Sequence, residues 1–188
     1  MVDTAGATEA WAREWTVTAT ASALNAGGPV GFYAGGQRGD ANPPAGRSGL
    51  LYLHPPTEGV PAKIERNVHL GRAPKLNLVV AGNSPVGGVG GDWQLVIKVN
   101  GTAVGAPRMI DGAQGWQELS YDLSAFTGRD ATIVIEGQPT GWYFEYVFED
   151  SISLTDGGAA ATVAPAENSA PSLRWSTGRS ARQASAER

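Results

Sequence analysis

The second half of the chain alternates apolar and polar residues over short runs that are separated by Gly-rich or Asn-Gly turns. Such two-residue alternation is typical of strands that bury one face. The clearest runs are residues 95–99, 116–123, 131–136 and 142–154, and weaker runs occupy 14–21, 50–54, 62–70 and 75–81. The pattern predicts an all-β fold: a two-sheet antiparallel β-sandwich of the jelly-roll type, with about eight or nine strands.

The turns between these runs are marked by glycine and asparagine. Asn100-Gly101 is the strongest signal for a tight hairpin, whose second strand begins near Ala103. Residues 122–128 read as a helical turn or loop that ends at Gly128. The loop 82–92 contains five glycines, which allow close backbone approach, so it either lines a site or turns a corner.

Composition restricts the chemistry. The 188 residues contain no cysteine, which excludes disulfides, thiolate zinc sites and a cysteine nucleophile.

Residues 1–158 form the expected β-sandwich domain, and residues 159–188 form a low-complexity Ala/Ser/Arg tail. The tail is extended, has few apolar anchors and is expected to be disordered alone. Its Leu173-Arg-Trp175 segment is either a peptide that docks on a protein partner or part of a flexible linker.

Charge and hydropathy restrict the classes of partner that the chain can bind. Residues 1–158 carry 10 Lys/Arg against 16 Asp/Glu, whereas residues 159–188 carry 4 Arg against 2 Glu. An acidic domain disfavours binding to phosphate backbones, so we expect no nucleic acid partner. No apolar run is long enough for a membrane span. The first residues lack the basic start and apolar stretch of a signal peptide, so none is visible in this chain.

Three segments carry a resemblance to a known family: GDWQLVIKVNG at 91–101, GWQELSYDLSAFTGR at 115–129 and FEDSISL at 148–154. Their order resembles galactose-binding-like β-jelly rolls, including carbohydrate-binding modules of bacterial secreted proteins. The resemblance covers residues 76–155, extends more weakly to 14–75 and leaves out the tail. It implies a jelly-roll fold, a sugar-binding role and an extracellular or cell-surface location.

The resemblance also implies a structural calcium ion where the first and last strands meet. Asp150 matches the acidic residue of the closing strand, and Glu14 is the candidate partner from the first strand. Calcium takes six to eight oxygen ligands, and the first strand lacks a paired acidic motif. No cofactor is therefore assigned from the sequence alone.

Carbohydrate binding needs flat aromatic faces and a few directed polar atoms. The candidates are aromatic residues beside Gly- or Pro-containing turns: Tyr33, Trp93, Trp142 and Tyr143. The alternative is core packing, because Trp142, Phe144, Tyr146 and Phe148 share one strand face, and Trp116 also reads as a core residue.

Catalytic motifs are weak. Glu145, Glu149 and Asp150 are close in sequence, but Glu145 and Glu149 share the face opposite the aromatics and read as a solvated sheet surface. Neither a zinc site nor a Ser-His-Asp triad is indicated, and the loop 82–92 lacks the phosphate-binding motif. We therefore expect a non-catalytic module that binds a glycan or polysaccharide, with a structural assembly subunit as the alternative and a hydrolase or lyase as the least supported hypothesis.

Overall fold

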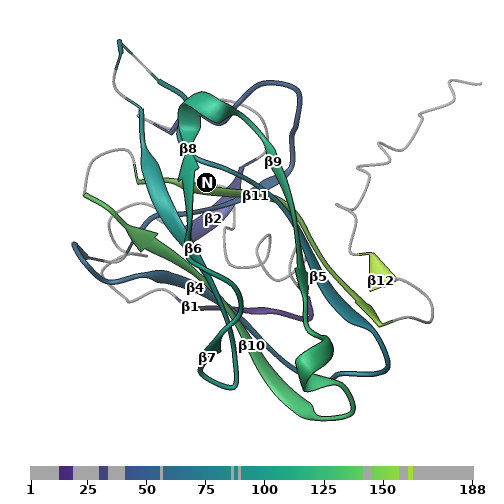
Figure 1. Ribbon diagram of the computed structural model, residues 1–188. Coiled ribbons are helices and arrows are strands. Elements are labelled where there is room, and N and C mark those ends of the chain that lie inside the picture. Colours follow the sequence, from purple (N-terminus) through teal and green to yellow (C-terminus); the bar gives the residue numbers. More distant parts are fainter. Residues whose placement is uncertain are drawn as a thin grey trace, which may run out of the picture.

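The structure is a computed structural model that describes residues 13–18, 30–33, 41–55, 57–85, 87–88, 90–141, 145–156 and 161–162. The described residues form two sheets in which all strand pairs are antiparallel. The sheets stack face to face (Figure 1). The predicted two-sheet antiparallel β-sandwich is therefore confirmed.

Each sheet has six strands among the described residues. Sheet A has the order β1 (Thr16–Thr18), β4 (Ala62–His69), β10 (Asp130–Pro139), β6 (Asp92–Val99) and β7 (Thr102–Ala103), and β8 (Arg108–Asp111) also pairs with β6. Sheet B has the order β2 (Val30–Tyr33), β3 (Leu50–Leu53), β11 (Val147–Asp156), β5 (Pro74–Ala81) and β9 (Gln117–Asp122), and β12 (Ala161–Thr162) pairs with β11. Two single-turn 3-10 helices, η1 (Gly112–Gln114) and η2 (Ser124–Phe126), flank β9.

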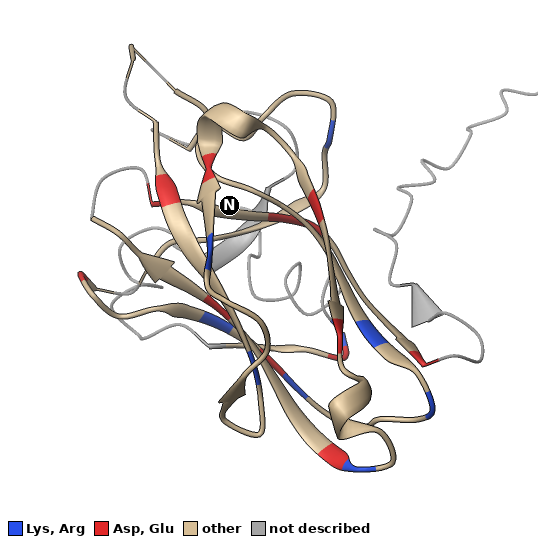
Figure 2. Cartoon of the chain, viewed as in Figure 1, with Lys and Arg blue, Asp and Glu red and all other residues tan. Residues whose placement is uncertain are grey.

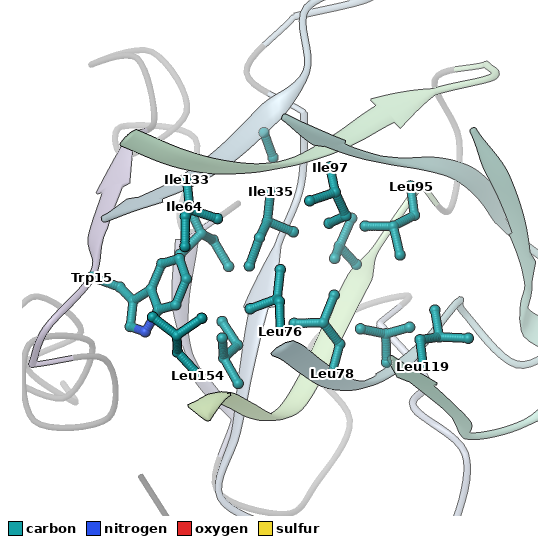
Figure 3. Packing of buried hydrophobic residues seen from close by; sticks show 14 of the residues in the cluster. Trp15, Ile64, Leu76, Leu78, Leu95, Ile97, Leu119, Ile133, Ile135 and Leu154 are labelled. Atoms are coloured by element: carbon teal, nitrogen blue, oxygen red, sulfur yellow. The ribbon is translucent and has the colours of Figure 1, made fainter. Parts of the chain in front are cut away.

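The core lies between the two sheets because their apolar residues alternate toward it. In β5, Leu76, Leu78 and Val80 are buried, while the intervening residues are more exposed. Figure 3 shows Leu76 and Leu78 of this row facing the isoleucines of β4, β6 and β10 across the interior. Fully burying one such side chain contributes about 1.5–3 kcal/mol, so the facing rows hold the sheets together.

The predicted turns form as expected. Asn100 and Gly101 both have positive φ, 51° and 79°, and β6 pairs with β7 across them. These angles match the tight hairpin turn that an Asn-Gly pair favours. The predicted helical turn within 122–128 corresponds to η2, where the Asp122 carboxylate accepts a hydrogen bond of 2.9 Å from the Ser124 backbone N–H.

Trp93 corrects the sequence interpretation. It was a candidate exposed sugar platform, but only 1% of the residue is accessible. It alternates inward with Leu95 and Ile97 in β6, and its Nε1–H donates a hydrogen bond of 3.2 Å to the Ala81 carbonyl of sheet B. The neighbouring Gly-rich loop indicated exposure, but the strand register directs this side chain into the core.

The closing aromatic run is also organised differently from the prediction. Strand β11 begins only at Val147, and Val147 packs in the core between the sheets, whereas Phe148 packs on the outer side of sheet B. Glu149, expected on a solvated surface, is 0% exposed and shares the inward face with Val147. Period-two alternation shows which residues share a face, but not which face is buried.

Charged residues are distributed over both sheets, with acidic and basic positions interspersed (Figure 2). In the part of the chain that the structure describes, no helix has the length and apolar character of a membrane span. The expected absence of a nucleic acid partner stays a prediction.

Trp93→Ala is expected to reduce the free energy of unfolding by about 3–5 kcal/mol, because it leaves a large cavity in the core. Urea unfolding followed by circular dichroism measures the change. Met109→Ala is the control, since Met109 lies on the adjacent strand but is 45% exposed, and it should change stability by about 0.5 kcal/mol at most. A Trp93→Ala protein of normal stability would contradict the buried placement.

Glu149→Gln is expected to stabilise the protein increasingly as the pH rises. Burial raises the pKa of Glu149 well above its ordinary value of 4.5. The folded state therefore retains a proton that the unfolded state releases, and wild-type stability falls as the pH rises from about 4.5 toward the folded-state pKa. The variant should match wild type near pH 4 and exceed it by about 1.4 kcal/mol for each pH unit between 4.5 and the folded-state pKa.

Urea unfolding at a series of pH values between 4 and 8 measures this difference. Glu65→Gln on β4 is the matched control, because Glu65 is only half-buried and carries the same change of charge. Equal pH slopes for wild type and Glu149→Gln would show that Glu149 is not buried in the folded protein.

Candidate ligand-binding surface

A second apolar cluster lies on the outer face of sheet B. Its buried members are Ala41, Leu50, Tyr52, Ala81 and Phe148, and Trp116 and Tyr146 pack against them while partly exposed. Strand pairing builds this cluster, because Tyr52 of β3 lies opposite Phe148 of β11. Tyr146 stacks near Phe148, with ring centroids 6.1 Å apart. The outer face of sheet B is therefore aromatic.

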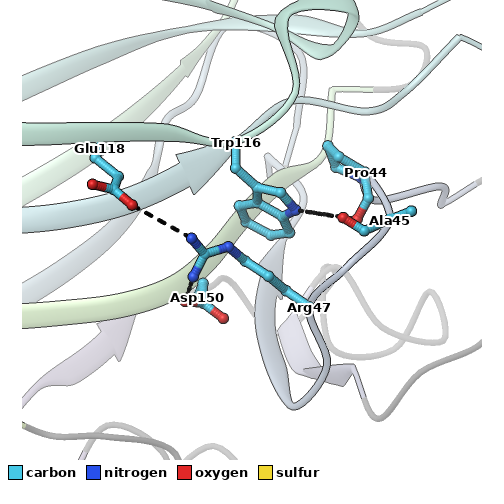
Figure 4. Close-up of polar contacts among 6 residues, drawn as sticks. All are labelled: Pro44, Ala45, Arg47, Trp116, Glu118 and Asp150. Carbon is cyan, nitrogen blue, oxygen red and sulfur yellow. Dashed lines mark hydrogen bonds and ion pairs between the residues drawn. The ribbon is translucent and has the colours of Figure 1, made fainter.

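Trp116 lies at the edge of this cluster, between η1 and β9. The sequence indicated a core residue, but the structure places its side chain half-buried on the outer face of sheet B. Its Nε1–H donates to the Pro44 and Ala45 carbonyls at 3.2 and 3.3 Å, as Figure 4 shows. These bonds attach the 41–49 loop to the indole and fix the ring orientation.

Arg47, from the same loop, connects the indole to two carboxylates (Figure 4). Its guanidinium carbon lies 5.5 Å from the centroid of the Trp116 ring. The guanidinium also pairs with the Asp150 carboxylate and, at 3.6 Å, with Glu118. A planar guanidinium suits both contacts, since it can lie over an aromatic face and bond carboxylates in its plane.

A β-bulge in β11 directs Asp150 toward Arg47. The pairing with β5 shifts register between Glu149 and Ser151, which leaves Asp150 as the extra residue. Bulges of this kind redirect side chains. Glu149 consequently points into the core while Asp150 reaches the outer face, where its side chain is only 15% exposed.

The result is a polar and aromatic surface formed by Arg47, Trp116, Glu118 and Asp150, which we call the Trp116 surface. It offers an apolar ring, guanidinium donors and carboxylate acceptors within one small area. Hydroxyl groups above an apolar ring would find both acceptors and donors here. The sequence missed this site because nothing near Trp116 indicated which side of sheet B it would occupy.

The other predicted aromatic residues fall largely outside the described part of the chain. Tyr33 ends β2, where its backbone pairs with Leu50 of β3, but its side chain is not described. Trp142 and Tyr143 both lie outside the described residues. Their assignment as carbohydrate-binding residues stays a prediction.

Glu145 bonds to Thr140, five residues earlier in the chain. The buried Glu145 carboxylate accepts hydrogen bonds from the Thr140 backbone N–H at 3.1 Å and from its hydroxyl at 3.2 Å. Burial raises the pKa of Glu145, the bonds from Thr140 partly oppose this, and the negative charge of Asp92 adds to it. Glu145 was predicted on a solvated surface, and its burial corrects that interpretation.

The two predicted calcium ligands are not brought together as one donor set. Glu14 pairs with Arg66 at 2.7 Å beside sheet A, whereas Asp150 pairs with Arg47 on sheet B. Each carboxylate is already bonded to a guanidinium. No group of three or more His, Asp or Glu side chains suited to a metal occurs among the described residues. This donor set does not fit calcium, which takes six to eight oxygens.

A shallow depression of about 380 Å³ lies at one end of sheet A. It is lined by Asn67, Val68, His69, Asn100, Asp130, Ala131 and Thr132. Its polar groups bond to one another: Thr132 donates through its hydroxyl to Asn67 at 2.6 Å and through its N–H to Asn100 at 2.8 Å. It offers no aromatic face, so the Trp116 surface is the better candidate for a sugar.

Comparison with known proteins gives no match to a protein-family model and none to a curated protein. The chain is similar to the solved structure of TmCBM61 in complex with β-1,4-galactotriose, with a TM-score of 0.46 and 16% identity over 76% of this chain and 88% of that chain. CBM35 from Paenibacillus barcinonensis gives a TM-score of 0.44 and 19% identity over 77% and 94%. Fisc, a Stig cyclase from Fischerella sp. TAU, gives 0.44 and 14% over 66% and 72%.

Carbohydrate-binding modules are thus among the solved structures that this chain is similar to, as the sequence resemblance predicted. A cyclase is similar to the same degree. One fold often serves unrelated functions, so these distant similarities assign neither a ligand nor an activity to this chain.

The Arg47–Asp150 pair is expected to contribute about 1 kcal/mol of coupling energy, because both side chains are largely buried and the pair is better shielded than a surface ion pair. A double-mutant cycle with Arg47→Met and Asp150→Asn, measured by urea unfolding, gives this energy. The same cycle with Glu118→Gln is the matched control. Glu118 is 78% exposed, so its coupling to Arg47 should be smaller. Equal couplings would contradict the described geometry.

Proposed function

We propose that this protein is a non-catalytic carbohydrate-binding module and that the Trp116 surface binds its glycan. The observation that carries the proposal is the half-buried indole of Trp116, held by two backbone carbonyls and flanked by Arg47, Asp150 and Glu118. Sugar C–H groups pack on indole rings, and sugar hydroxyls bond to guanidinium and carboxylate groups.

The geometry favours binding over hydrolysis. A glycosidase needs one protonated carboxyl and one free carboxylate on either side of the scissile bond. Both acids of the Trp116 surface, Glu118 and Asp150, instead share one guanidinium. Glu149 is close in sequence but faces the opposite side of sheet B. The acids therefore serve as hydrogen-bond acceptors in this proposal.

We also propose Tyr33, Trp142 and Tyr143 as carbohydrate-binding residues. The backbone of Tyr33 pairs with Leu50 of the aromatic cluster, and Trp142 and Tyr143 are close in sequence to Tyr146 of the same cluster. A glycan ligand would be met outside the cell or at its surface, so we propose that location with the function.

The alternative function is a structural assembly subunit whose tail docks on neighbouring chains. We rank it second, because the described start of the tail, Ala161–Thr162, pairs with β11 of its own chain. Light scattering of the full chain separates the two. A stable oligomer that loses assembly on truncation after residue 158 would favour the assembly subunit.

Trp116→Ala should weaken glycan binding by about tenfold or more, which corresponds to the loss of about 1.4 kcal/mol of stacking and contact energy. The assay is affinity electrophoresis through gels that contain galactans, xylans, mannans or β-glucans, followed by calorimetry on the polymer that retards wild type. His69→Ala, an exposed substitution on sheet A, is the control and should bind as wild type does.

Thermal unfolding of each variant shows whether a lost signal reflects lost folding. A wild-type chain that no polymer retards would overturn the proposed function. Normal binding by a folded Trp116→Ala protein would remove Trp116 from the site and leave Trp142 and Tyr143 as the next residues to replace.

A further inference from the structure

Glu149 and Gln117 are polar residues in an otherwise apolar row of the core. The pairings of β11, β5, β3 and β9 align Leu51, Glu149, Val80 and Gln117 across sheet B. Leu51 and Val80 are both fully buried in the core between the sheets. Directly paired residues share a face, so the Glu149 and Gln117 side chains enter the same layer of the interior.

Three polar atoms in this row have no protein partner. They are the Gln117 Nε2 and both carboxylate oxygens of Glu149, which form no hydrogen bond with any described residue. A buried polar group that lacks a hydrogen bond lowers the stability of the folded state by about 1–3 kcal/mol. Here an unpaired donor and two unpaired acceptors lie in the same layer of the core. Native interiors seldom leave such groups unpaired.

A hydrogen bond from Arg108 orients the Gln117 amide. Its Oε1 accepts a hydrogen bond of 3.3 Å from the Nε–H of Arg108. Arg108 begins β8 at the border of sheet A and is exposed, so this bond links the borders of the two sheets beside the β8–η1–β9 connection (Figure 1). Because the amide oxygen faces Arg108, the amide N–H₂ is turned away from this partner.

Strand geometry allows one small group to bridge the two side chains. Strands two positions apart in a sheet place paired Cα atoms about 10 Å apart. Glutamate and glutamine side chains can lean across Val80 and shorten this gap. Two hydrogen bonds of about 2.8 Å to one shared oxygen then span about 5 Å between the polar ends.

We propose that Glu149 and Gln117 form an interior binding site for a single water molecule. The water oxygen accepts a hydrogen bond from Gln117 Nε2, and the water donates to, or accepts from, the Glu149 carboxyl group. A protonated carboxyl both donates and accepts, so the neutral form of Glu149 can satisfy either arrangement. The site lies inside the sandwich and is independent of the Trp116 surface.

The surroundings of Glu149 agree with a neutral carboxyl group. Leu51 and Val80 flank it within sheet B, and neither carries charge. Glu149 and Arg108 of β8 both act electrostatically on Tyr121 of β9, whose pKa is raised mainly by burial. The pKa of Glu149 is itself raised by burial.

A crystal structure of the full chain tests the site directly. The expected result is an ordered water within hydrogen-bond distance of both Gln117 Nε2 and the Glu149 carboxyl group. A direct Gln117–Glu149 hydrogen bond, or a dry gap between them, overturns the proposal.

A mutant cycle in solution tests the same bridge. Glu149→Leu and Gln117→Leu each remove one side of it, so their shifts in melting temperature at pH 5 should be non-additive by about 2–4 °C. Met109→Ala with Glu149→Leu is the control, because Met109 is 45% exposed and pairs with Gln94 of sheet A, so its shift should be additive. Additive shifts for the Glu149–Gln117 pair would overturn the bridge.

Discussion

The alternation of side chains along β11, interrupted by its bulge, determines how the interior and the outer surface of sheet B are built. β11 lies inside sheet B with β5 on one side and β3 on the other, so each of its side chains must enter one of two packed layers. Val147 and Glu149 enter the core, and Phe148 enters the outer cluster. The extra residue at Asp150 then reaches outward to Arg47. A one-residue slip in this strand would exchange the two layers.

The outer cluster gives sheet B a second packed layer. Tyr52 and Phe148 are nearly inaccessible although they lie outside the main core. The 41–49 loop is joined to this layer by the Trp116 Nε1–H and by the Arg47 ion pair, which are long-range contacts between distant parts of the chain. Loops held on a rigid sheet in this way commonly carry binding residues. Trp116 therefore packs against the aromatic cluster, and the Arg47–Asp150 ion pair holds the loop beside it.

Glu149 conflicts with the pattern of its own strand. A fully buried carboxyl group in an apolar row lowers stability at neutral pH, and a leucine would pack there at lower cost. Such local conflicts tend to coincide with functional sites, where stability is given up for a chemical property. The shared row with Gln117 supplies a physical reason for the residue. The Gln117 Nε2 and the Glu149 carboxyl group have no hydrogen-bond partner among the described residues, and one water molecule can satisfy both.

Residues 76–154 specify much of the fold locally. Alternation in β5, β6 and β10, the Asn100-Gly101 turn and the helical turn after Asp122 all follow from short-range preferences, and each forms as the sequence predicts. Local pattern does not reveal which face of a strand meets the other sheet. That is why Trp93 was placed outside, and Glu145 and Glu149 on a surface, although all three are buried.

The amino-acid sequence is enough to predict the strands, the antiparallel two-layer architecture and the absence of cysteine chemistry, because these depend on composition and on neighbours a few residues apart. The candidate site, in contrast, forms only when the chain is folded. Arg47, Trp116 and Asp150 come from three separate segments, and their meeting depends on strand order and on one bulge. Such long-range register is set by how whole sheets pack, which no short stretch of sequence encodes.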